Sequence, residues 1–320
     1  MEETLLIANF DQAAEKRILD TLSYDHQINN NNLRNSLSYI KKIVNTPDAY
    51  RSYYQQLTPL ELAILDFIGK NLTVLEYQAY KYILLNQDFY GKIHQSQFVK
   101  LLKKLFGIGL IERKSYFDEN KKKKYAYLLT ARGHDFEKYI LNHNYIDPTV
   151  LLHMKNEFYV QCWQAVDLQM VLEQQPFYLN SQIVIKNNHP LLHCLLAADE
   201  ETLYDCSIYF WLHDFNNNIQ NRLNHLPVTN LEKHSLSYAT TFTKIIPLTL
   251  ISVNDINTLK ELKERLKDNG HYGIVILSLI DNGKNGETDN KDKKGILRSI
   301  IVKNNGKINW LKFRQISDEK

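Results

Sequence analysis

Residues 96–113 read SQFVKLLKKLFGIGLIER, and this stretch decides the fold predicted for the first half of the chain. Its apolar residues recur at the spacing of a helix with one buried stripe, namely Phe98, Leu101, Leu102 and Leu105. The helix should start near Ser96 and end at Gly107, because glycine readily terminates helices. After Gly109 the period changes to that of a strand. The stretch therefore predicts a helix followed at once by a strand.

The segments on both sides of this stretch extend the prediction. Residues 58–61 (TPLE) and 73–76 (TVLE) each contain a capping box, and each predicts the start of a helix. Residues 125–129 predict a second strand after a polar loop, and residues 130–133 begin another helix. The order helix, helix, helix, hairpin, helix is typical of a winged helix-turn-helix, which we predict for residues 58–147.

The polar face of the third predicted helix and the hairpin beside it carry side chains suited to DNA. A duplex major groove admits one helix, glutamine amides can pair with adenine, and lysines can reach phosphates or guanine edges. Residues 94–126 contain nine basic and three acidic residues, a local net charge of +6, so affinity for DNA should fall steeply with salt. The predicted DNA-binding residues are Gln95, Ser96, Gln97, Lys100, Lys103, Lys104, Arg113, Lys121, Lys122, Lys123 and Lys124.

Each of these features also has an ordinary structural explanation. A lysine-rich helix face is usually a solvated surface, and Lys121–Lys124 could be a plain hairpin turn. Some winged helices contact only proteins. A protein-interaction module without DNA binding is therefore the main alternative.

Three runs of residues resemble bacterial winged-helix proteins: 57–65 (LTPLELAIL), 101–113 (LLKKLFGIGLIER) and 127–133 (YLLTARG). The likeness is closest to the replication-relaxation type found on plasmids and conjugative elements, and it covers about 80 residues. This resemblance implies binding to double-stranded DNA, as a transcriptional regulator or as an accessory factor in replication or conjugation of a mobile element. It also implies a C-terminal domain similar to a restriction-nuclease fold.

Charge is distributed unevenly along the chain. The whole chain of 320 residues carries +3, whereas residues 58–147 carry +4, residues 148–255 carry −5 and residues 256–320 carry +5. We predict an α+β protein with a helical N-terminal extension (1–57), the winged helix, and a mixed α/β C-terminal domain (148–320). The acidic part of this last domain suits protein contact better than phosphate contact. We therefore expect it to mediate homodimerisation or to bind a partner protein, and the paired half-sites of such DNA-binding modules also favour a homodimer.

The C-terminal domain lacks the residue pattern of a metal-dependent nuclease. Such an enzyme needs an acidic residue and then an acidic-x-lysine pair on the neighbouring strand, to hold Mg²⁺ and activate water. Neither Asp205 nor Asp214 is followed by a lysine two positions later, and Asp199–Glu201 is interpreted as a hairpin turn. If the fold is nuclease-like, its active site is degenerate. A Mg²⁺-dependent DNA-cleaving enzyme remains an alternative function.

Other chemistry lacks its usual motifs. The chain contains no GxGxxG or Walker loop, no HExxH and no GxSxG. Cys162, Cys194 and Cys206 show no CxxC pairing, so we interpret them as buried free thiols. His193 and Cys194 near Cys206 could form a metal site, but buried core positions explain them better. We predict no catalytic, metal-binding or cofactor-binding residues.

Hydropathy gives a prediction about the compartment. No stretch of about 20 uncharged apolar residues occurs, and the acidic start Met1-Glu2-Glu3 lacks the basic flank of a secretory signal. We therefore expect a soluble, cytoplasmic protein.

Overall fold

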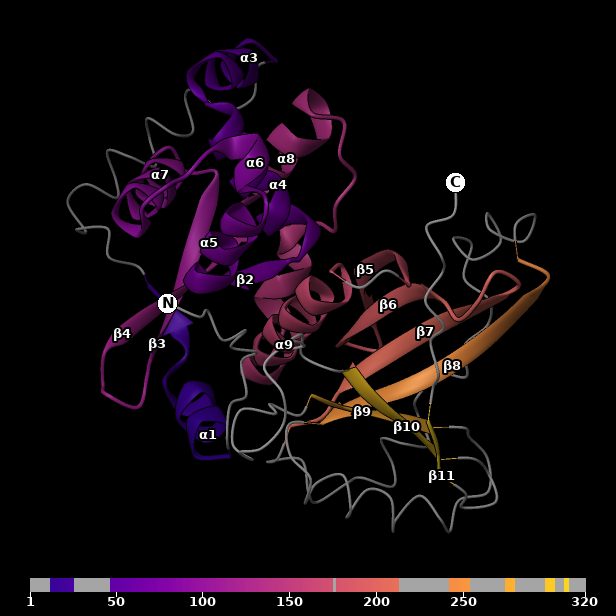
Figure 1. The fold of residues 1–320 in the computed structure, drawn as a ribbon. Coiled ribbons are helices and arrows are strands. Elements are labelled where there is room, and N and C mark those ends of the chain that lie inside the picture. Colours follow the sequence, from indigo (N-terminus) through magenta and orange to yellow (C-terminus); the bar gives the residue numbers. More distant parts are fainter. Residues whose placement is uncertain are drawn as a thin grey trace. The chain divides into compact units, whose positions relative to one another are not determined.

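The computed structural model describes residues 12–25, 47–174, 177–212, 242–253, 274–279, 297–302 and 308–310. The chain divides into two compact units: the first is Arg17–Val166, and the second joins Met1–Lys16 to Asp167–Lys320. Each unit contains a sheet, and helices accompany the sheets, so the fold is mixed α+β (Figure 1). The first unit includes residues 17–25 and 47–57 in addition to the segment 58–147.

The first half of the described chain is mostly helical. Its elements, in order, are α1 (Gln12–Thr21), β1 (Ser23–Tyr24), α3 (Pro47–Gln56), α4 (Pro59–Lys70), β2 (Thr73–Leu75), α5 (Glu76–Leu85), α6 (Gln87–Tyr90), α7 (Gln95–Gly107), β3 (Ile111–Phe117), β4 (Lys123–Leu129), α8 (Ala131–Ile140), the 3-10 helix η1 (Pro148–His153) and α9 (Asn156–Leu172). The expected order of three helices, a hairpin and a fourth helix corresponds to α4, α5, α7, β3–β4 and α8. The unit boundary after Val166 falls inside α9.

The start of α4 agrees with the prediction from its sequence. Thr58 Oγ1 accepts a hydrogen bond from the backbone N–H of Glu61 (3.3 Å), and Glu61 Oε2 accepts one from the backbone N–H of Thr58 (2.8 Å). Both halves of the capping box therefore form. Pro59 stands in the first turn, where its missing N–H leaves no hydrogen bond unmade.

The predicted start of the second helix was wrong. Residues 73–75 form β2, which pairs antiparallel with β4, and α5 begins only at Glu76. Thr73 is fully buried, and its Oγ1 accepts a hydrogen bond from Trp163 Nε1 (3.2 Å) instead of capping the helix. Gln78 closes the start of α5, because its Oε1 accepts from the backbone N–H of Leu75 (2.9 Å). A buried partner strand thus outweighs the local capping signal.

The sheet of the first unit holds the hairpin in place. Its strands lie in the order β1-β3-β4-β2, and all neighbours are antiparallel. The hairpin runs from the pair Ile111–Leu129 at its base to the pair Phe117–Lys123 near its tip. The core beside this sheet consists of completely or almost completely buried side chains from three helices and from the residue before β3: Ile64, Ile68, Ile83, Phe98, Leu102, Leu105 and Leu110. Leu101 is half-buried and lies outside the fully buried stripe predicted for α7.

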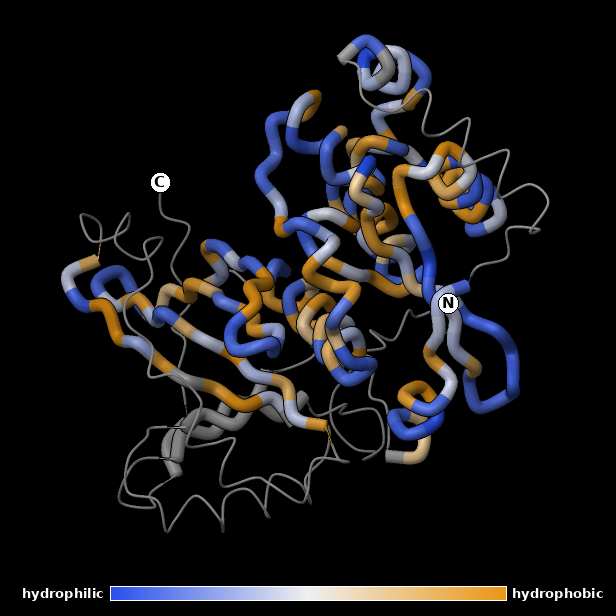
Figure 2. Tube along the Cα trace, turned by 180° about the vertical axis from the view of Figure 1, so that it is seen from behind, coloured by the Kyte–Doolittle hydropathy of each residue, from blue (hydrophilic) through white to orange (hydrophobic). Residues whose placement is uncertain are grey.

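The second unit contains a seven-stranded mixed sheet. Its strands are β5 (Tyr178–Lys186), β6 (His189–Ala197), β7 (Thr202–Phe210), β8 (Lys244–Val253), β9 (Ile274–Leu279), β10 (Leu297–Val302) and β11 (Ile308–Trp310). They lie in the order β11-β10-β9-β8-β7-β6-β5, with β7–β8 and β8–β9 parallel and the other pairs antiparallel. Apolar runs mark several of these strands (Figure 2), and β6 and β7 are mostly buried.

Among the helices of the described segments, none is both long and apolar enough to cross a lipid bilayer.

Candidate nucleic-acid interface

The helix α7 has two chemically different faces. Phe98, Leu102 and Leu105 are completely buried, whereas the polar side chains on the other side are exposed: Gln95, Ser96, Gln97, Lys100 and Lys103. The first turn of α7 contains no acidic residue, so its backbone N–H groups and positive dipole end are not neutralised locally. This arrangement gives α7 an outward surface that can meet a polyanion.

Gln97 has a structural function within the helix. Its Oε1 accepts a hydrogen bond from the backbone N–H of His94 (3.0 Å), which closes the amino end of α7. A two-bond contact between Gln97 and adenine would require this bond to open. Gln95 lies two residues earlier, is exposed and has no such bond among the described residues, so its amide is better placed to contact a base.

Lys104 was predicted to contact DNA, but its ammonium forms an ion pair and a hydrogen bond within the protein. Lys104 Nζ lies 2.9 Å from Glu61 Oε2 and 2.9 Å from the backbone oxygen of Gln56. The Glu61 side chain is 1% exposed, so its carboxylate depends on partners within the fold. Lys104 therefore joins α7 to the start of α4, and this ion pair limits what it can offer to a phosphate.

We expect Lys104→Ala to lower the free energy of unfolding by about 1–2 kcal/mol, because the buried Glu61 carboxylate loses its cation. The neighbouring exposed lysine supplies the matched control, and Lys103→Ala should change stability by less than about 0.5 kcal/mol. Urea unfolding followed by circular dichroism measures both values. Equal stabilities of the two variants would contradict the structural function assigned to Lys104.

Not all four lysines at the hairpin tip are exposed and without an acidic partner, because Lys123 and Lys124 each lie near a carboxylate. Asp118 builds the turn, because its Oδ1 accepts from the backbone N–H groups of Asn120 (2.9 Å) and Lys122 (2.8 Å). These bonds and the nearby Lys124 hold the pKa of Asp118 below its usual value. Lys121 and Lys122 are exposed in this turn, and Lys121 has a positive φ of 56°. Lys124 lies within β4, with its Nζ 3.6 Å from Asp118 Oδ2.

Arg113 and Lys123, both predicted to contact DNA, take part in an internal charge cluster. Asp25, whose side chain is 4% exposed, lies 2.8 Å from Arg113 Nε and 2.8 Å from Lys123 Nζ. The guanidinium of Arg113 also stacks over the rings of Phe106 (4.7 Å) and Tyr125 (4.5 Å). The reason is the pairing of β1 with β3, which brings the residue after β1 beside Arg113.

Lys114 is a further basic residue whose charge does not reach the surface. It is 4% exposed, and its Nζ lies over the rings of Tyr24 (4.0 Å) and Tyr159 (3.7 Å). Burial lowers the pKa of Lys114 to about 8, and the nearby carboxylate of Glu112 opposes this shift. Lys114 is included in the local net charge of +6, but its ammonium lies against aromatic rings and adds little to the exposed charge.

Four lysines remain exposed on α7 and on the hairpin turn, without an ion-pair partner among the described residues: Lys100, Lys103, Lys121 and Lys122. The other basic residues between 94 and 126 contact Glu61, Asp25, Asp118 or aromatic rings. The set of exposed, unpaired lysines is therefore smaller than the sequence indicated, and its members lie on α7 and on the turn between β3 and β4, both within the first unit.

The acidic and thiol residues considered for chemistry in the second unit lie on β6, on β7 and in the turn between them. Asp205 is 1% exposed, and its Oδ1 lies 2.6 Å from Nε2 of the buried His193. Asp199 forms the turn by accepting from the backbone N–H groups of Glu201 (3.0 Å) and Thr202 (2.7 Å). Cys194 and Cys206 are buried free thiols on opposite positions of the two strands. Asp214 lies outside the described residues.

No protein-family model, curated protein or solved structure matches this chain.

Proposed function

We propose that α4, α5, α7, the β3–β4 hairpin and α8 form a winged helix-turn-helix that binds double-stranded DNA. In this proposal α7 enters the major groove, and the turn between β3 and β4 follows the phosphate backbone. The observation that carries the proposal is the presence of four exposed lysines on these two elements, together with an amino end of α7 that lacks acidic residues.

The internal ion pairs reduce the number of basic residues that this proposal assigns to DNA contacts. Because Lys104, Arg113 and Lys123 have partners within the fold, the DNA contacts fall to the four exposed lysines, with Gln95 and Ser96 nearest to base edges. Lysine contacts with phosphate give affinity with little sequence preference, whereas amide contacts with base edges give specificity. We therefore infer that the lysines set the strength of binding and that Gln95 contributes to target choice.

The test measures binding to a labelled duplex of random sequence by fluorescence anisotropy. The salt concentration is varied from about 50 to 200 mM, a range over which phosphate contacts change the affinity strongly. The slope of log affinity against log salt is negative, and we expect it to become shallower by about 2 in Lys100→Ala/Lys103→Ala and by a similar amount in Lys121→Ala/Lys122→Ala. The control Lys138→Ala/Lys155→Ala removes two exposed lysines of the first unit, one on α8 and one between η1 and α9, and should keep the slope of the unmodified protein.

Two results would overturn the proposal. The first is no salt-dependent binding by the unmodified protein, which would favour a protein-interaction module. The second is an equal change of slope in the control variant, which would show that only net charge matters.

Adding Mg²⁺ to the same samples tests the enzyme alternative, because a nuclease would nick the duplex. A footprint at a promoter would indicate transcriptional control, and one at a replication or transfer origin would indicate an accessory function there.

A further inference from the structure

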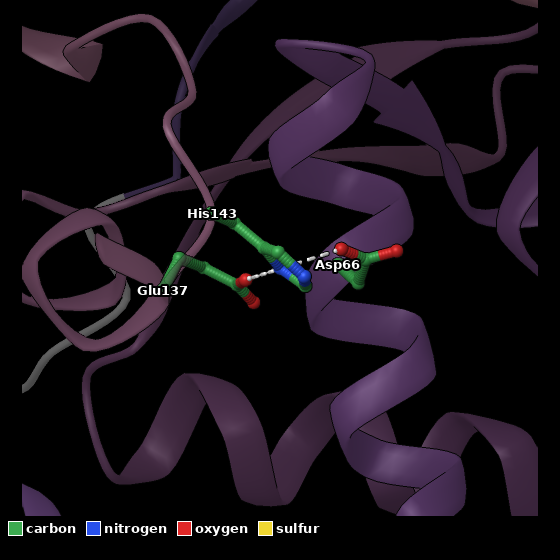
Figure 3. Close-up of side chains that lie close together, drawn as sticks. All are labelled: Asp66, Glu137 and His143. Atoms are coloured by element: carbon green, nitrogen blue, oxygen red, sulfur yellow. Dashed lines mark hydrogen bonds and ion pairs between the residues drawn. The ribbon is translucent and has the colours of Figure 1, made fainter. Parts of the chain in front are cut away.

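A histidine and two carboxylates meet in the first unit, apart from the exposed face of α7. Asp66 comes from α4, Glu137 from α8 and His143 from the segment after α8 (Figure 3). One donor atom from each of the three residues lies within 4.8 Å of the others. His143 Nδ1 is 2.8 Å from Glu137 Oε2 and 2.9 Å from Asp66 Oδ1.

The end of α8 explains why His143 returns to Glu137. Asn142 adopts a left-handed conformation with φ of 58°, and the backbone N–H of His143 donates to the backbone oxygen of Glu137 (3.0 Å). This bond runs from the second residue beyond the C-cap Leu141 to a carbonyl in the last turn of α8. It turns the chain back on itself and puts the imidazole beside the Glu137 carboxylate. Asp66 is fixed in turn, because its Oδ1 accepts a hydrogen bond from Tyr145 Oη.

The hydrogen bonds of this cluster do not satisfy its acceptors. Nδ1 of an imidazole carries at most one proton, so it cannot donate a full hydrogen bond to both carboxylates. The Glu137 side chain is completely buried, and its second oxygen, Oε1, has no hydrogen-bond partner. The cluster is therefore short of positive charge at a point where several lone pairs converge.

We propose that Asp66, Glu137 and His143 bind a divalent transition-metal cation of the Zn²⁺ type, through His143 Nδ1 and the carboxylate oxygens of Asp66 and Glu137. Imidazole nitrogen and carboxylate oxygen are ligands that Zn²⁺ takes at about 2.0–2.2 Å, which puts donors of one ion about 3 Å from one another. The two distances from Nδ1 already have this size. The unpaired Oε1 of Glu137 gives the ion a second oxygen from the buried side.

The exposure of the three ligands allows an ion to enter and leave. The side chains of Asp66 and His143 are 33% and 40% exposed, whereas that of Glu137 is fully buried. Solvent can therefore reach the ion from one side and complete its coordination with water. The bound cation would connect α4 to α8 and to the segment after it, so it should also stabilise the first unit.

The experiment is a titration of the full chain with Zn²⁺ by isothermal calorimetry, and with Co²⁺ by visible absorption. We expect one equivalent of metal to bind and the melting temperature to rise with metal. Glu137→Gln, Asp66→Asn and His143→Gln should each weaken binding by at least about tenfold, because even partners of ligands contribute this much. The controls Asp135→Asn, on the same helix as Glu137, and His153→Gln, an exposed histidine in η1, should bind as the unmodified protein does.

The outcomes separate a built site from other binding. Absence of a Co²⁺ absorption change and of Zn²⁺ heat would overturn the proposal, and so would metal binding that the three ligand variants leave unchanged. Circular dichroism checks that each variant is folded. If Glu137→Gln fails to fold, the two variants at partly exposed positions, Asp66→Asn and His143→Gln, decide the question.

Discussion

Replacing Gly133 by alanine should lower the free energy of unfolding by about 3 kcal/mol or more. Gly133 lies in the first turn of α8, and its backbone N–H donates to Thr130 Oγ1 (3.0 Å). A methyl group on its Cα would lie 2.0 Å from the carbonyl oxygen of Leu110. That oxygen is itself fixed, because it accepts from the backbone N–H of Thr130 (3.1 Å) and from Thr130 Oγ1 (3.2 Å). Neither backbone can move aside without losing these bonds.

Helix propensity predicts the opposite sign, which makes this substitution informative. Alanine is favoured over glycine inside helices by about 1 kcal/mol, so a sequence argument alone would expect Gly133→Ala to stabilise α8. Gly107, the last residue of α7, is the matched control, because a methyl group there would meet nothing within 4 Å. Gly107→Ala should keep or raise stability by up to about 1 kcal/mol. Urea unfolding followed by circular dichroism compares the two, and equal stabilities would contradict the close packing of α8 on Leu110.

Local signals in the sequence identified α4, α7, α8 and the hairpin of the first unit. The capping box at Thr58, the apolar period of α7 and the change of period after Gly109 each depend on residues close together in the chain. The start of α5 shows where this approach fails. Residues 73–75 match a capping box, but they pair with β4, more than fifty residues later, and this pairing decides their structure.

The candidate site was predicted less completely, for the same physical reason. Periodicity can tell which face of α7 is polar, but it cannot tell which lysine meets a buried carboxylate. The bond of Lys104 to Glu61 spans 43 residues, and that of Lys123 to Asp25 spans 98. The cluster of Asp66, Glu137 and His143 also depends on how α8 packs on α4. Its local signal was Asn142 after the helix, a residue type that favours the left-handed turn which returns His143 to Glu137.

Replacing Asp25 by asparagine should lower the free energy of unfolding by about 3 kcal/mol. The substitution removes the carboxylate that forms ion pairs with two partly buried cations, Arg113 and Lys123. The side chain of Arg113 is 14% exposed, so water can replace the lost carboxylate only poorly. Asp20→Asn, at an exposed carboxylate on α1, is the matched control and should change stability by less than about 0.5 kcal/mol. Similar losses in the two variants would contradict the importance of this cluster.

A double substitution distinguishes the ion pair from a general effect on folding. If the penalty arises from the unpaired guanidinium, Arg113→Met should cost less in the Asp25→Asn background than in the unmodified protein. The proposed DNA binding provides a second readout at temperatures where both proteins are folded. Lys123, whose side chain is 30% exposed, loses its partner in Asp25→Asn, so it becomes available to phosphate and should steepen the salt dependence by up to about 1. An unchanged salt dependence, with the expected loss of stability, would mean that Lys123 lies beyond the reach of the duplex and that the hairpin contacts DNA through its turn alone.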